Sequence, residues 1–158
     1  MISLITSVII FNAFVIGLVI KHGWLRSVSA YWYKMKNKWI FTIAMWAFSI
    51  LLMLAGQTLL ICLAGAMICF TAGAANSRAL KMTETVHVIG ATGGIITGML
   101  ALIHLGYWFI AVPQLIFTIL AMKLNMKNHT FWIEVVAFNI TALVIYLASK
   151  GILINLIK

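Results

Sequence analysis

The sequence predicts an all-α integral membrane protein, built as one bundle of six transmembrane helices. Hydrophobic residues make up 65% of its 158 residues and charged residues only 8%, whereas soluble domains carry about 25% charged residues. The mean hydropathy is +1.14, and the apolar residues form long uncharged runs separated by short basic segments. A chain this apolar cannot present a polar surface to water, so we expect residues 1–158 to form a single transmembrane domain.

The first apolar run covers residues 1–20. It has no basic leading segment, and no small-x-small cleavage motif precedes the KHGWLR stretch, so we expect a retained first helix rather than a cleaved signal peptide. The next uncharged run holds the thirty-nine residues between Lys38 and Arg78. One helix of that length would reach about 58 Å, nearly twice a ~30 Å hydrocarbon core. We therefore predict two spans, at about 39–55 and 58–76.

The same reasoning divides the second long uncharged run, between Glu84 and Lys123. Glycine and polar residues mark the turn of each hairpin, AGQT in the first run and HLGYW in the second. The second hairpin is thus predicted to place spans at about 85–104 and 107–122. A final apolar run predicts a sixth span at about 131–149.

Basic residues are distributed unevenly between the two sides of this six-span plan. Nine of the eleven Lys and Arg residues fall in the segments that join spans 1–2, 3–4 and 5–6, whereas only Lys150 and Lys158 fall on the opposite side. Because cytoplasmic loops are enriched in Lys and Arg, the basic side is predicted to be cytoplasmic and both termini to lie outside. We expect the membrane to be a bacterial inner membrane.

The basic segment at 21–38 is predicted to form an interfacial amphipathic helix. Its basic residues fall mostly away from the apolar and aromatic residues that recur at helical spacing, which are Trp24, Val28, Tyr31, Met35 and Trp39. Such a segment favours contact with anionic lipid headgroups. The net charge of +9 does not indicate nucleic acid binding, because no basic domain exists outside the predicted spans.

The stretch VHVIGATGG, at 86–94, has glycine spacing like that of a dinucleotide-binding turn. Such a turn needs a preceding strand and an acidic residue about 20 positions downstream, but a polar segment precedes this one and no acid follows at that distance. We interpret it as the start of the fourth helix, with Thr83 as its cap and Glu84 in its first turn. Glycines four residues apart predict a smooth face for close helix packing, with a ligand cleft against the bare backbone as the alternative. They are Gly90, Gly94 and Gly98.

Ionisable residues inside a bilayer are costly and often mark functional sites. Glu134 carries the only formal charge inside a predicted span, and it is expected on the cytoplasmic side together with Glu84 and His87. The alternative is a structural polar cluster that joins spans 4 and 6. A metal site for an ion such as zinc is a further alternative, with His22, His87 and His129 as ligands, although their spacing matches no compact metal motif.

Three uncharged polar residues lie in the middle of predicted spans: Asn12, Gln114 and Asn139. If they face inward, they are expected to hydrogen-bond between helices, with a transport path as the alternative. Pro113 should kink the fifth span because proline lacks a backbone N–H.

Two short motifs resemble a pattern in small six-span bacterial membrane proteins. SVSAYWY (27–33) is similar to their S-x-S-x-Y-Y motif near the end of span 1, and VHVIGA (86–91) is similar to their V-H-x-[IV]-G-A motif at the start of span 4. These proteins are distantly similar to the alkaline-ceramidase and progestin-receptor-like membrane hydrolases, which use a Ser, an Asp and three His around zinc. That resemblance implies Ser27 or Ser29 and His87 as counterparts, but the chain has no Asp.

Three functions are compatible with these features. The first is a non-enzymatic membrane protein whose cytoplasmic-side polar pocket binds a lipid, an ion or a small solute. The residues expected to line this pocket are Ser27, Ser29, Glu84, His87 and Glu134. The second is a membrane-embedded, metal-dependent lipid hydrolase, and the third is a small transporter or channel, as a homo-oligomer, that couples to protons through Glu134. Apart from the zinc alternative, the sequence predicts no cofactor.

Overall fold

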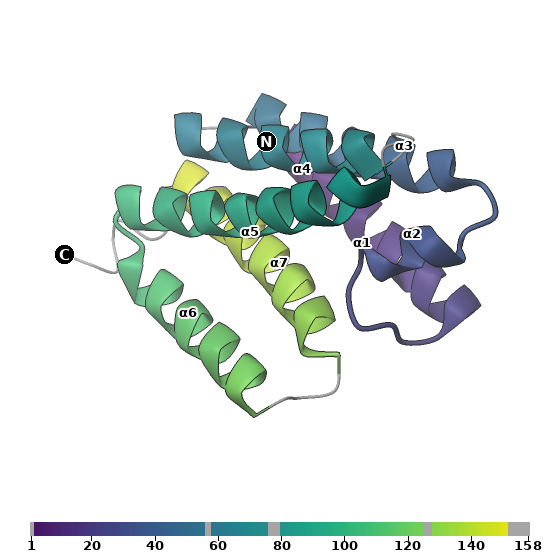
Figure 1. Cartoon of the computed structure of the whole chain (residues 1–158). Helices are drawn as coiled ribbons and strands as arrows, with labels where there is room; N and C mark the ends of the chain where they lie inside the picture. Colours follow the sequence, from purple (N-terminus) through teal and green to yellow (C-terminus); the bar gives the residue numbers. More distant parts are fainter. Residues whose placement is uncertain (1, 56–57, 76–79, 125–127, 152–158) are drawn as a thin grey trace.

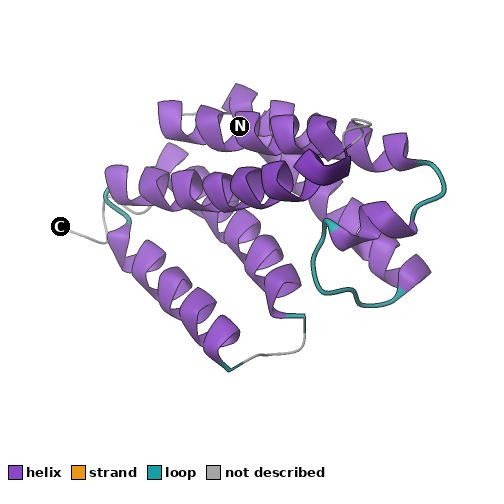
Figure 2. Cartoon of the chain, in the orientation of Figure 1, coloured by secondary structure: helices purple, strands orange, loops and turns teal. Residues whose placement is uncertain are grey.

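The computed structural model describes residues 2–55, 58–75, 80–124 and 128–151, with side chains described throughout except at 75 and 80–88. Within these residues the regular secondary structure consists of helices joined by loops and turns, and no strand is present (Figure 2). The helices found there, in chain order, are α1 (Ile2–His22), α2 (Ala30–Lys34), α3 (Lys38–Ala55), α4 (Leu59–Ala75), α5 (Leu80–His104), α6 (Trp108–Lys123) and α7 (His129–Ser149).

Each of the six segments predicted to be a long helix is a helix in the structure. Three of them, α1, α3 and α7, are long and apolar enough to cross a membrane by length and composition. The helices α4 and α6 and the described part of α5 carry shorter apolar stretches. The second hairpin turns where the sequence predicted it, at Gly106, whose φ of +87° suits a residue without a side chain.

The start of the fourth long helix was predicted incorrectly. The helix α5 begins at Leu80 rather than near residue 85, so Thr83 is not its cap and Glu84 is not in its first turn. The residues before 85 include Leu, Lys and Met, which favour helix, so the helix extends beyond the apolar run that was used to locate it.

The continuous amphipathic helix predicted over 21–38 is also wrong. In the structure α1 ends at His22, the chain turns at Gly23 with a φ of +72°, and only the short α2 is helical before α3. Tyr31 is fully buried and Trp32 only 6% exposed, so both pack into the bundle rather than lying along its surface. Burial of these large aromatic side chains outweighs the modest helical preference of the segment.

The long helices form an irregular bundle (Figure 1). Figure 1 shows α3, α4 and α5 along one side of the molecule, with α1 and α7 passing beneath them. The most extensive contacts are those of α4 with α5 and α3, followed by those of α1 with α3. The helix α6 lies at the periphery, where it contacts α5 and α7 but leaves most of its large apolar side chains exposed.

Two of the three mid-span polar residues form the interhelical hydrogen bonds that were expected, and they do so with each other, between α1 and α7. The Asn12 Nδ2 atom donates to the Asn139 Oδ1 atom at 2.7 Å, and the Asn139 Nδ2 atom donates to the Asn12 Oδ1 atom at 3.1 Å. Each amide also donates to a carbonyl one turn earlier in its own helix, that of Val8 or Val135, at 2.9 Å. Both amides therefore use both of their N–H donors, which avoids unsatisfied polar groups in an apolar bundle.

The third mid-span polar residue behaves differently. Gln114 lies inside α6 next to Pro113 and is only 4% exposed, but neither its Oε1 nor its Nε2 atom is hydrogen-bonded to another described residue. The expected interhelical bond is thus found for Asn12 and Asn139 and not for Gln114.

Candidate functional site

The segment between α1 and α2 lies against the first turns of α7. The backbone N–H of Val28 donates to the Glu134 Oε2 atom at 2.6 Å. Phe131 lies three residues earlier in α7, and its backbone N–H donates to the carbonyl of Arg26 at 2.9 Å. This N–H is one of those that a helix start leaves without a partner inside the helix. These two bonds bring the one described carboxyl group to residues about a hundred positions earlier in the chain.

Ser27 and Ser29 form a small hydroxyl pair beside this contact. Their Oγ atoms lie 2.9 Å apart and share a hydrogen bond. The Ser27 Oγ atom also accepts the N–H of Ala30 at 3.1 Å, at the point where α2 begins. Serine favours helix starts because its hydroxyl can accept an N–H that the helix leaves unpaired.

Tyr31 ties the beginning of the loop to its end. Its hydroxyl donates to the carbonyl of Gly23 at 2.8 Å and accepts the N–H of Leu25 at 3.4 Å. Its ring packs against Phe131 of α7 in an edge-to-face arrangement, with 6.3 Å between ring centroids. The loop is therefore fixed to the bundle by both side-chain packing and hydrogen bonds.

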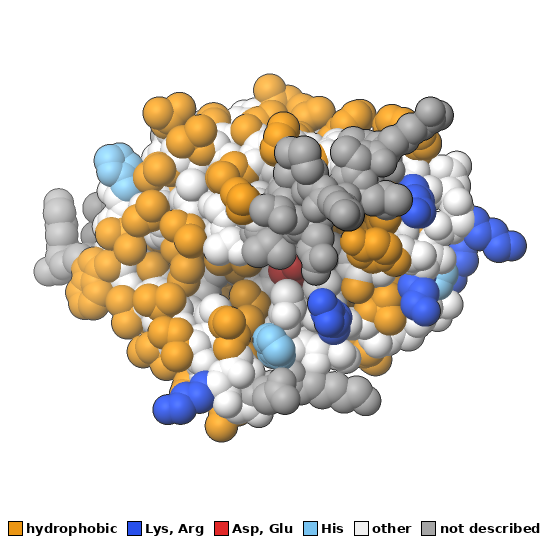
Figure 3. Space-filling model, viewed as in Figure 1, with side chains coloured by type: hydrophobic (Ala, Val, Ile, Leu, Met, Phe, Trp, Pro, Cys, Tyr) orange, Lys and Arg blue, Asp and Glu red, His pale blue; other side chains and the backbone are white. Residues whose placement is uncertain are grey.

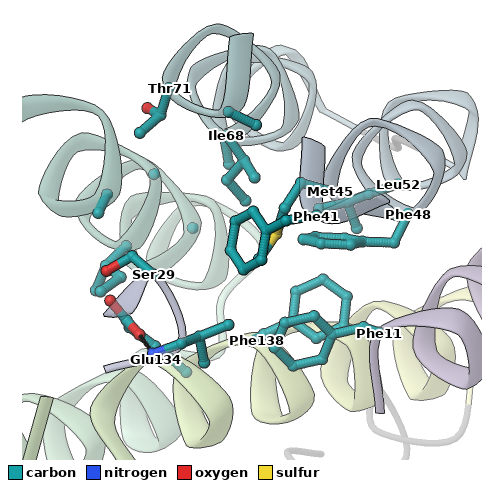
Figure 4. A pocket seen from close by; sticks show the side chains of 18 of the residues that line it. Phe11, Ser29, Phe41, Met45, Phe48, Leu52, Ile68, Thr71, Glu134 and Phe138 are labelled. Carbon is teal, nitrogen blue, oxygen red and sulfur yellow. Dashed lines mark hydrogen bonds between the residues drawn. The ribbon is translucent and has the colours of Figure 1, made fainter. Parts of the chain in front are cut away.

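A cavity of about 150 Å³ lies behind this loop, between α1, α2, α3, α4, α5 and α7, and it is partly open to the surface. Its wall is mostly apolar, and Glu134 and Ser29 both line it. In the close-up view the oxygens of Ser29 and Glu134 point toward one another at one end of the cavity (Figure 4). The rest of the wall is built mainly from aromatic and aliphatic side chains, which include Phe11, Phe41, Phe48 and Phe138.

Sequence reasoning missed this apolar half of the cavity, although part of the signal was present. Phe41, Met45, Phe48 and Leu52 follow one another at helical spacing in α3, and all four line the cavity. Phe11 and Phe138 come from α1 and α7, and their ring centroids lie only 4.2 Å apart. A spacing pattern in one helix can identify such a face, but it cannot identify the helices that close the cavity opposite it.

The glycines of α5 lie at helix contacts. Gly90, Gly94 and Gly98 are all buried. A Cβ atom added at Gly94 would lie 3.3 Å from the Ile68 Cγ1 atom of α4, and one added at Gly90 would overlap the Thr71 hydroxyl. Gly98 faces Thr141 of α7, and Gly94 and Gly98 also line the cavity. The close approach of α4 to α5 thus depends on glycine, which has no side chain, at these positions.

Three of the five predicted pocket residues lie together: Ser27, Ser29 and Glu134. The other two, Glu84 and His87, belong to the backbone of α5, but their side chains lie outside the described part of the chain.

The structure describes the side chains of two of the three predicted metal ligands. His22 ends α1, with its ring centroid 6.4 Å from that of Tyr31, and His129 begins α7. His87 lies outside the described side chains. In the part of the chain whose side chains are described, no three His, Cys, Asp or Glu residues lie close enough together to hold a metal ion.

Basic side chains are unevenly distributed over the face shown in Figure 3. Hydrophobic side chains cover much of this face, whereas most of its Lys and Arg side chains gather at the right, on the side of α2 (Figure 3). Glu134, the only acid whose side chain is described, is half-buried and lines the partly open cavity.

Comparison with known proteins found no matching protein-family model, curated protein or solved structure.

Proposed function

We propose that this chain is a six-span integral membrane protein of a bacterial inner membrane, with both termini outside and its basic segments in the cytoplasm. The proposal is supported by the three helices with the length and composition of a span and by the three shorter apolar helices between them. The concentration of basic residues in alternate connecting segments supports the orientation.

The basic segment at 21–38 is proposed to contact anionic lipid headgroups. Its basic residues Lys21, Arg26, Lys34, Lys36 and Lys38 are all exposed. Trp24 and Trp39 are more than half exposed beside them, and tryptophan favours the boundary between lipid and water. The exposed outer face of α6 is proposed to meet lipid or a second copy of the chain.

The function that the geometry supports best is the binding of a small, mostly apolar ligand with one polar group. The observation that carries this proposal is the cavity itself, in which the Glu134 carboxyl group faces an aromatic wall. An apolar cavity of about 150 Å³ is known to hold a molecule of benzene size. The ligand is therefore small, or inserts only one ring or a short chain.

The proposal can be tested with two brominated probes of nearly identical shape, the cation 4-bromo-N,N,N-trimethylanilinium and the neutral 1-bromo-4-tert-butylbenzene. Bromine quenches nearby tryptophan fluorescence, and Trp32 lines the cavity. In proteoliposomes, at least one probe should quench saturably. Ala137→Phe, which fills the cavity beside Glu134, should remove the saturable part, and Trp32→Phe should remove the reporter.

The matched control is Ala66→Phe, at an exposed position of α4 outside the cavity. This variant should retain saturable quenching. Quenching by both probes that never saturates, or that is the same in Ala137→Phe as in the unaltered protein, would contradict a ligand cavity.

Proton-coupled transport is a second candidate. It is favoured by the position of Glu134, which lies within a candidate span and lines the cavity. In proteoliposomes with an imposed pH gradient, uptake of a probe should depend on the gradient, and Glu134→Gln should remove that dependence. Uptake that responds to the gradient equally in both proteins would count against this role for Glu134.

A further inference from the structure

We infer that the cavity selects a lipophilic organic cation, such as a small aryl or alkyl ammonium, over neutral and anionic molecules of the same shape. This inference rests on the proposed ligand-binding function and adds the chemical class of the ligand. It is carried by one carboxyl group that accepts a single hydrogen bond from the described residues and lines a cavity with aromatic walls.

Among the described residues, the Glu134 carboxyl group has few partners for its charge. Its Oε2 atom accepts the N–H of Val28, and no hydrogen bond from a described residue reaches Oε1. None of the Lys and Arg side chains that the structure describes forms an ion pair with it. A carboxylate can accept about four hydrogen bonds, and a partly buried charge with a single partner is unfavourable. A cation in the cavity would supply the missing partner.

The cavity wall that Glu134 shares includes aromatic rings, which attract a cation. Phe138 lies one helical turn after Glu134 on α7, so both side chains occupy the same face of that helix. The Phe138 ring packs against Phe11 and Phe48, with centroid distances of 4.2 and 5.1 Å. The faces of aromatic rings carry partial negative charge and attract organic cations, most strongly where water is excluded.

One cation–aromatic contact already exists at the edge of the cavity. The Lys38 Nζ atom lies 3.8 Å from the centroid of the Trp32 ring, and Trp32 lines the cavity. The Lys38 ammonium repels a second cation, but Lys38 is exposed, so water and salt screen its charge. The Glu134 carboxylate is less exposed to solvent and therefore has the larger effect inside the cavity.

Other ligand classes fit less well. An anion would face the Glu134 carboxylate without a described cation inside the cavity. An inorganic cation needs several oxygen ligands, but the wall offers few, and the Thr71 hydroxyl already donates to the carbonyl of Met67 at 2.6 Å. An organic cation needs only one carboxylate and an apolar surface, and the cavity provides both.

The test compares dissociation constants of the two probes described above, with 4-bromobenzenesulfonate as the anion. Proteoliposomes of zwitterionic phosphatidylcholine are used, because anionic lipids would concentrate the cation at the surface. Each constant is corrected for the probe's partition into protein-free vesicles. The cation should bind about tenfold more tightly than its neutral isostere.

Glu134→Gln separates charge from shape, because the glutamine side-chain oxygen can still accept the N–H of Val28. This variant should bind both probes with similar affinity. Equal binding of cation and neutral probe by the unaltered protein would overturn the cation inference but leave the ligand cavity intact. An undiminished cation preference in Glu134→Gln, or tighter binding of the sulfonate, would also overturn it. Saturable binding of none of the three would instead overturn the proposed function.

Discussion

At the scale of single residues, Glu134 has two contacts of different kinds. Through its Oε2 atom it holds the loop before α2 by the N–H of Val28, and through the same carboxyl group it lines the cavity. The loop bond orients the side chain, which limits the number of positions that the charge can adopt. A ligand that binds there meets a carboxyl group already held in place, so little rotamer entropy is lost on binding.

Tyr31→Phe tests how firmly the loop is held. This change removes the bonds of the hydroxyl to Gly23 and Leu25 and leaves the buried ring in place. We expect the free energy of unfolding, measured by denaturation with sodium dodecyl sulfate, to fall by about 1 kcal/mol. Tyr33→Phe is the matched control, because Tyr33 is 67% exposed, and it should change stability little. Equal losses in both variants would show that the Tyr31 bonds do not hold the loop.

Gln114→Leu tests the opposite situation, a buried amide without a described partner. Replacing it by an apolar side chain of similar size removes two unsatisfied polar atoms. The same unfolding measurement should show a gain of about 1 kcal/mol. A loss of stability would show that the Gln114 side-chain amide forms stabilising hydrogen bonds in the membrane-embedded protein.

At the scale of elements, the contact between α4 and α5 depends on small residues. Gly90→Ala would place a methyl group against Thr71 of α4. We expect it to lower the free energy of unfolding by about 1–3 kcal/mol, the usual effect of an added methyl group in a packed interface.

The control for this prediction is Gly17→Ala in α1. A Cβ atom at Gly17 meets nothing within 4 Å, and the position is exposed. This substitution should raise stability by up to about 1 kcal/mol, because alanine favours helix more than glycine does. If Gly90→Ala does not lower the free energy of unfolding relative to Gly17→Ala, the close packing of α5 on α4 is not supported.

An element could be predicted from the sequence when its pattern is local, and not when it depends on contacts with distant residues. The long helices were predicted because each corresponds to a continuous apolar run bounded by a turn or by basic residues. The segment at 21–38 was predicted incorrectly because the burial of Tyr31 depends on α7, more than ninety positions later. Glu134 stood out as a charge in an apolar run, but the cavity beside it is formed by helices from most of the chain, and no local pattern encodes it.

At the scale of the whole molecule, two regions of different chemistry are arranged around one cavity. Exposed aliphatic and aromatic side chains cover the helices, as expected for surfaces that meet lipid. The described basic residues gather mainly around α2, close to the loop that carries Ser27 and Ser29. The polar end of the cavity therefore lies next to the basic region.

The six-span proposal makes a prediction about sidedness. Cysteines introduced at Lys36 and Lys150, with Cys62 and Cys69 replaced by alanine, should react with a membrane-impermeant maleimide from opposite sides. In intact cells the cysteine at 150 should be labelled and the cysteine at 36 should be protected until the cells are opened. Labelling of both from the same side would contradict an odd number of spans between them.

The binding of a cation beside Glu134 can be observed most directly by anomalous X-ray scattering from bromine. Crystals grown with 4-bromo-N,N,N-trimethylanilinium should show one bromine peak in or at the opening of the cavity lined by Glu134 and Phe138. The peak should be absent in Ala137→Phe crystals grown in the same way. Bromine found only on the outer, lipid-facing surface would contradict the proposed site.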